Sequence, residues 1–109
     1  MELKTIRPME TLLLESDKLI YKTNIFVSNR FDIAKLKKIS ILTSNQGPIS
    51  DDVALALFFD TIVLILPSEH KNFKVFLFDK ISKSFKINYN EIIKAMSCVE
   101  NAEFVLWSL

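Results

Sequence analysis

The side chains that could carry acid–base or metal chemistry are few and scattered in this chain of 109 residues. His70 is the only histidine, and it follows Glu69 where a helix is expected to begin. A catalytic histidine needs a nucleophile or an acid partner, and a metal site needs two or more further ligands. Neither spacing surrounds His70, so we interpret it as an exposed surface residue.

The single cysteine, Cys98, is a poor candidate for a nucleophile. A thiolate is favoured by a nearby cation or by a helix N-terminus. Cys98 lies at the C-terminal end of an expected helix, where the helix dipole disfavours negative charge. We therefore interpret Cys98 as a buried structural residue. A lone cysteine also excludes an internal disulfide framework and a cysteine-based zinc cluster.

Four acidic residues are the candidates for binding a partner. Asp51 and Asp52 end the one long polar loop, residues 43–52. Adjacent residues of an extended chain point to opposite sides, so these two do not form a carboxylate dyad. Two interpretations stay open: charge displayed toward a basic partner or a cation, and ordinary solvation of a turn. Glu15 and Asp17, around the first expected turn, complete the set.

Composition and charge exclude several classes of protein. The formal net charge is +1, so no global field points to nucleic acid. Lys35, Lys37 and Lys38 form a small basic cluster, which we interpret as solvated. The longest apolar segment, residues 53–66, is shorter than the roughly 20 residues of a membrane span. Residues 1–10 are charged where a signal peptide would be apolar, so we expect a cytoplasmic protein.

The apolar pattern predicts a single α+β domain over residues 1–109. Half of the residues are hydrophobic, which is enough for a substantial core. Two apolar runs within 53–66 flank Asp60-Thr61 and predict an antiparallel hairpin. Further strands are expected at 11–15, 19–27, 39–43 and 102–107, and turns at 16–18, 28–30 and 34–38. Within 33–39, a helical turn capped by Asp32 and a strand both fit the pattern.

Beyond residue 67 the apolar spacing becomes three to four residues, which predicts two helices. The apolar stripe of the first helix is Phe73, Phe76, Leu77, Ile81 and Phe85. The second begins at Asn88, followed by Glu91 in a capping-box pattern, and its stripe is Ile92, Ile93, Met96 and Val99. The final strand is apolar on both faces, so we expect it to be covered on both. A mostly antiparallel sheet with two C-terminal helices and a closing strand is typical of the α+β class.

Residues 31–66 resemble the strand succession of small pleckstrin-homology-like domains. The resemblance rests on Phe-Asp-Ile, then Leu-Lys-Lys-Ile-Ser-Ile-Leu-Thr, a polar loop and two further strands. The segment from Ile87 to Ser97 and the strand from Glu103 to Trp107 are similar to the endings of small bacterial proteins. Some proteins of this build are immunity proteins, which neutralise a toxin from the same cell.

No acid–base pair or nucleophile–base spacing is visible, so we expect a non-enzymatic binding protein without a cofactor rather than a small enzyme with scattered catalytic residues. The resemblance suggests what kind of binding protein it is. Its leading form is an immunity protein that blocks the active site of a bacterial toxin, as in contact-dependent growth inhibition. If that toxin is a nuclease, Glu15, Asp17, Asp51 and Asp52 would mimic phosphate charge and speed association. The chain itself would then contact no nucleic acid. The alternative is a pleckstrin-homology-like module that binds a lipid or a peptide.

Overall fold

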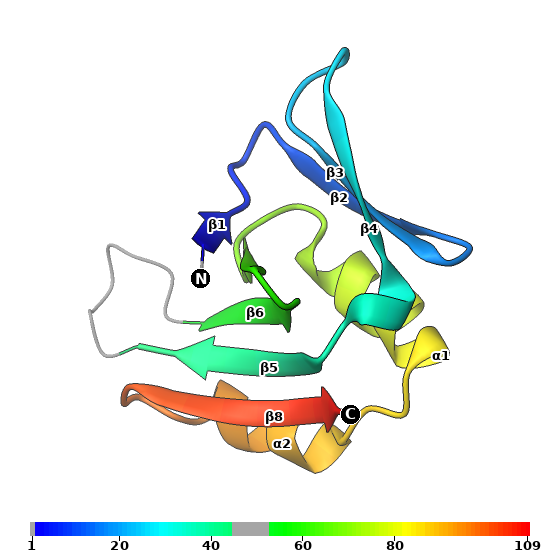
Figure 1. The fold of residues 1–109 in the computed structure, drawn as a ribbon. Helices are drawn as coiled ribbons and strands as arrows, with labels where there is room; N and C mark the ends of the chain where they lie inside the picture. Colours follow the sequence, from blue (N-terminus) through cyan, green and yellow to red (C-terminus); the bar gives the residue numbers. More distant parts are fainter. Residues whose placement is uncertain (1, 45–52) are drawn as a thin grey trace.

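The computed structural model describes residues 2–44 and 53–109 and shows two β-sheets with helices packed against them (Figure 1). The five-stranded sheet has the order β1-β7-β6-β5-β8, and the three-stranded sheet has the order β2-β3-β4. The strands are β1 (Glu2–Thr5), β2 (Thr11–Glu15), β3 (Lys18–Lys22), β4 (Ser28–Asp32), β5 (Lys38–Thr43), β6 (Val53–Phe58), β7 (Ile62–Pro67) and β8 (Ala102–Ser108). The predicted α+β class is confirmed, but the strands form two sheets rather than one.

The two apolar runs form the centre of the larger sheet. β6 pairs antiparallel with β7, which confirms the predicted hairpin. Asp60-Thr61 connects the strands, and the Phe59 N–H donates to the Ile62 carbonyl at 2.9 Å. Such a two-residue connection is the commonest hairpin loop. Three consecutive residues of β6 and two of β7 are fully buried, which explains why each run is apolar without alternation: Leu55, Ala56 and Leu57, then Val63 and Leu64.

β1 is a strand that the sequence pattern does not predict. It pairs parallel with β7, with Glu2 opposite Ile62 and Thr5 opposite Ile65. Its sequence, Glu-Leu-Lys-Thr, is short and mostly polar, so no apolar run indicates it. The pairing therefore depends on β7, which lies far from β1 in the sequence and offers it a free edge.

The predicted turn at 28–30 is wrong, because Ser28–Asp32 is the edge strand β4 and pairs with β3. The first turn is shorter than predicted: it consists of Ser16 and Asp17, and Ser16 has a φ of 52°. The helical turn after β4 is confirmed as η1 (Ile33–Lys35). The Asp32 side chain caps it by accepting from the Ala34 N–H at 3.0 Å.

The first helix consists of η2 (Val75–Ile81), with wide π-type turns, and α1 (Ser82–Ser84). Four residues of its predicted stripe are buried, namely Phe73, Phe76, Leu77 and Ile81. The fifth, Phe85, lies just after the helix in extended backbone and is half-buried. No helix among the described residues is both long and apolar enough to cross a bilayer.

The second helix is α2 (Tyr89–Met96), and Asn88 caps it by accepting from the Asn90 N–H at 3.1 Å. Glu91 does not close the capping box but pairs with Lys94 at 3.1 Å. The predicted stripe is largely wrong: Ile92 and Ala95 are buried, whereas Ile93, Met96 and Val99 are exposed. The closing strand β8 is also only partly covered, because it lies at a sheet edge and Val105 is exposed.

One cluster of buried side chains joins the two sheets and the helices. Helix η2 packs against β2, and α2 packs against β8 and β5. Phe31 of β4 meets Phe59 of the β6–β7 hairpin with ring centroids 5.2 Å apart. The small sheet is therefore held to the large one by shared apolar packing.

We expect Phe76→Ala to lower the free energy of unfolding by about 3–5 kcal/mol, because the ring is 2% exposed and its loss leaves a cavity. Phe78→Ala on the same helix is the matched control, since that ring is 43% exposed. Urea unfolding measures both. Equal losses in the two variants would contradict the packing described here.

Candidate functional site

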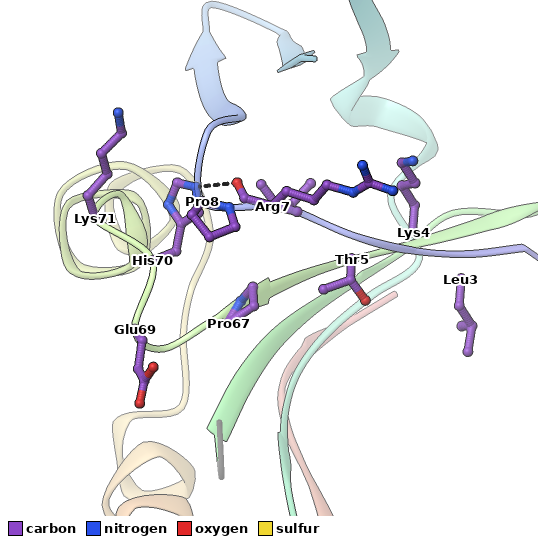
Figure 2. A pocket seen from close by; sticks show the side chains of 10 residues that line it. Leu3, Lys4, Thr5, Arg7, Pro8, Pro67, Glu69, His70 and Lys71 are labelled. Carbon is purple, nitrogen blue, oxygen red and sulfur yellow. Dashed lines mark hydrogen bonds between the residues drawn. The ribbon is translucent and has the colours of Figure 1, made fainter. Parts of the chain in front are cut away.

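His70 is buried, so its interpretation as an exposed surface residue is wrong. The side chain is 8% exposed. Its Nε2 lies 2.8 Å from the Glu10 carbonyl. It also lies 3.2 Å from the Arg7 carbonyl, the contact drawn as a dashed line in Figure 2. Its Nδ1 accepts from the Asn72 N–H at 3.0 Å, which assigns the ring proton to Nε2. Both ring nitrogens therefore bind the backbone, and His70 joins the chain after β7 to the β1–β2 connection.

A buried carboxylate lies beside this histidine contact. Glu10 is 7% exposed, and its Oε1 accepts from the Tyr21 hydroxyl at 2.6 Å and from the Arg7 N–H at 2.8 Å. Burial raises the pKa of Glu10, but these two hydrogen bonds and the charges of Lys4 and Arg7 outweigh it, so the pKa lies below its usual range. The carboxylate is consequently ionised at neutral pH, with Oε1 accepting both hydrogen bonds.

Tyr21 is the buried partner of that carboxylate. Burial raises the pKa of the phenol, and the adjacent Glu10 raises it further. Tyr21 therefore remains a proton donor throughout the physiological range. The residues that this cluster connects are 11 and 60 residues apart in the sequence, so no local motif could have indicated it.

A pocket of about 760 Å³ opens beside the cluster. Its lining includes three cations, one carboxylate and an apolar wall: Lys4, Arg7 and Lys71, then Glu69, then Leu3, Pro8 and Pro67. Figure 2 shows Arg7 extending back toward Lys4 on one side of the β1 segment, with Leu3 and Thr5 on the other. Such a lining is suited to an anionic ligand rather than to proton transfer.

A second feature is an apolar loop between β3 and β4. Ile25 and Phe26 are 90% and 88% exposed, and Met9 and Val27 lie beside them around one shallow pocket. We call Met9, Ile25, Phe26 and Val27 the apolar tip. Asn24 Oδ1 accepts from the N–H groups of Phe26 at 2.7 Å and Val27 at 2.9 Å, so the loop is shaped by its own side chain.

Sequence reasoning missed the apolar tip because it assigned residues 19–27 to one strand. The signal that could have found it is Asn24, which interrupts the strand pattern and favours a turn. The strand ends at Lys22, and the loop projects from the small sheet at the top of Figure 1.

The predicted partner-binding residues are only partly placed by the structure. Glu15 and Asp17 are both exposed at the β2–β3 turn, at the end of the small sheet opposite the apolar tip (Figure 1). Asp51 and Asp52 lie outside the described residues, so their role stays a prediction. The structure brings Glu15 and Asp17 together at one turn but does not bring them to the apolar tip or to the pocket.

Cys98 is half-buried, less enclosed than predicted, and its Sγ lies 3.6 Å from Thr43 Oγ1. Within residues 2–44 and 53–109, no three histidine, cysteine or acidic side chains lie close enough together to hold a metal ion.

Comparison with protein-family models, with curated proteins and with solved structures gives no match. The immunity-type and pleckstrin-homology-like resemblances, and the absence of enzymatic activity, therefore stay predictions.

We expect Tyr21→Phe to lower the free energy of unfolding by about 1.5–3 kcal/mol at pH 7, because Glu10 loses a donor to its buried charge. The Glu10 pKa is lowered by folding, so this stabilisation is complete above the unfolded pKa of about 4.5 and is lost as pH falls through the folded pKa. The difference in unfolding free energy between the variant and the parent should therefore shrink below about pH 4.5.

Urea unfolding at several pH values measures this effect. Tyr89→Phe is the matched control, since Tyr89 is exposed and its loss should change stability by less than about 0.5 kcal/mol. If Tyr21→Phe lowers the free energy of unfolding by the same amount at pH 7 and at pH 3, the ionised carboxylate is not the acceptor.

Proposed function

We propose that the chain is a non-enzymatic binding protein that recognises a protein partner through the apolar tip. The observation that carries this proposal is the near-complete exposure of Ile25 and Phe26 in a loop fixed by Asn24. Single exposed apolar residues are ordinary, but a contiguous apolar patch marks an interaction site. A preformed loop also loses little conformational entropy on binding, which favours affinity.

The specific form we propose is an immunity protein that covers the active site of a toxin. The resemblance described above supports it, and so does the second exposed feature of the small sheet, the acidic pair Glu15 and Asp17. The net charge of +1 means that any charge attraction must be local. Glu15 and Asp17 would steer a basic partner, while the apolar tip would supply the contact that slows dissociation.

A lipid-binding module is the second candidate, and one observation favours it. Lys22 is exposed beside the apolar tip and lines the same shallow pocket. Apolar side chains next to a cation suit insertion at the surface of an anionic membrane.

Replacing Ile25 and Phe26 together with Ser should raise the Kd for the partner by at least about thirtyfold, since central apolar anchors cost about 2 kcal/mol or more when truncated. The assay is coexpression with the candidate toxin encoded directly upstream in the native genome, followed by calorimetry on the purified pair. Val75→Ser is the control, because it removes an exposed apolar side chain from a different surface.

Three outcomes separate the candidates. Growth arrest that persists in the presence of the parent chain would contradict the immunity form. Protection that survives the Ile25 and Phe26 substitutions would show that the contact lies elsewhere. Sedimentation of the parent with anionic vesicles, lost in that variant, would favour the lipid module instead.

Replacing Glu15 with Gln and Asp17 with Asn should slow association with the toxin and flatten its dependence on salt, because charges that steer the approach of a partner act mainly on the association rate. Stopped-flow kinetics at low and moderate salt measure both quantities. Asp79→Asn is the control, as Asp79 is an exposed acid on helix η2. Unchanged association at both salt concentrations would remove the acidic pair from the interface.

A further inference from the structure

We propose that the free edge of β1 accepts an extended, acidic segment of another protein as an added strand. The proposal rests on the hydrogen-bonding direction of β1 and on the charge of the pocket beside it. It is independent of the apolar tip and would describe a second contact surface.

The backbone of β1 leaves one side unpaired within the described part of the chain. The Glu2 N–H donates to Thr61 at 2.9 Å, and the Ile6 N–H donates to Ile65 at 2.8 Å, so the even-numbered residues face β7. Backbone groups alternate in direction along a strand, which turns the N–H and C=O groups of Leu3 and Thr5 to the other side. These groups form the template on which a further strand can pair.

The positive charge beside this edge favours an acidic segment as the added strand. The pocket along residues 3–8 has Lys4, Arg7 and Lys71 in its lining against the single carboxylate of Glu69. The ion pairs of Lys18, Lys37, Lys38 and Lys94 involve none of these three cations, although the charges of Lys4 and Arg7 also act on Glu10. An incoming strand with acidic side chains would meet these cations, whereas a second copy of β1 would bring Lys4 close to Lys4.

The other sheet edges are less suited to accepting a strand. β2 is packed against helix η2. β8 has an irregular register, since its pairing with β5 passes from Val105 to Trp107, and a bulge of this kind protects an edge. β4 lies at the remaining edge of the small sheet, and the shallow pocket that includes Ser28 of β4 has one cation, Lys22, among its lining residues.

The test uses a short capped peptide of alternating Val and Glu, added to the ¹⁵N-labelled full chain. Binding should shift the amide signals of Leu3 and Thr5 and slow the hydrogen exchange of both. Replacing Lys4 and Lys71 together with Glu should raise the Kd of the peptide by about tenfold or more. Lys83→Glu, an exposed charge reversal on helix α1, should leave the Kd unchanged.

Two matched changes distinguish strand addition from simple charge attraction. Thr5→Pro removes an outward N–H without removing a bond to β7, because proline is tolerated where an edge N–H faces solvent. It should abolish peptide binding while the β7 amide signals keep their positions. The same peptide N-methylated at alternate residues keeps its charge but lacks the donors for a ladder, so it should not bind.

The proposal is overturned if the peptide does not bind at millimolar concentration, or if Thr5→Pro and N-methylation leave binding intact. The variant with Ser at positions 25 and 26 should bind the peptide like the parent. Peptide binding retained by the Ile25→Ser, Phe26→Ser variant would separate strand addition at β1 from any loss of toxin binding at the apolar tip.

Discussion

The buried, ionised carboxylate of Glu10 is the constraint on which the arrangement of the two sheets depends. A carboxylate removed from water must keep its hydrogen-bond donors, because an unpaired buried charge is strongly destabilising. The donors to the carboxylate come from the Tyr21 hydroxyl in β3 and from the backbone N–H of Arg7. His70, which follows β7, binds the backbone carbonyl of Glu10. Three segments distant in sequence are therefore fixed at one point. The course of residues 7–10, and with it the position of both the pocket and Met9, follows from that point.

Much of the fold follows from local patterns. The hairpin at 53–66, the apolar face containing Phe76 and the Asn88 cap depend on spacing and on intrinsic preferences, and the structure has each of them. The errors fall where local preference is weak. β1 and β4 are short and polar, and each exists because an established strand offers it an edge. The stripe of α2 was assigned wrongly because the helix covers an outer strand, so Ile93 faces away from the sheet.

The candidate site was far less predictable than the fold. The burial of His70 depends on carbonyl groups 60 and 63 residues away, and periodicity carries no information about such partners. The missing catalytic spacing around His70 did not imply exposure, because the partners that bury the ring are backbone groups. The apolar tip was hidden for the opposite reason: Ile25-Phe26-Val27 fits a strand as well as it fits a loop. The hydrogen bonds that Asn24 Oδ1 accepts from Phe26 and Val27 hold these residues in a loop instead of a strand.

The free energies of burial and association indicate what the apolar tip and the edge of β1 would each contribute to binding. Burying Ile25 and Phe26 contributes about 1.5–3 kcal/mol for each side chain. Association costs about 4–15 kcal/mol in lost freedom of motion, which offsets most of the roughly 3–6 kcal/mol from these two side chains, so tight binding needs further contacts. Residues 3–8 line the pocket beside β1, and the next residue, Met9, belongs to the apolar tip. Pro8 in the lining of that pocket is therefore the sequence neighbour of Met9 in the apolar tip. Glu10 and His70 hold residues 7–10 in place, so a partner large enough to cover both surfaces would add charge contacts beside β1 to the apolar contacts of the tip.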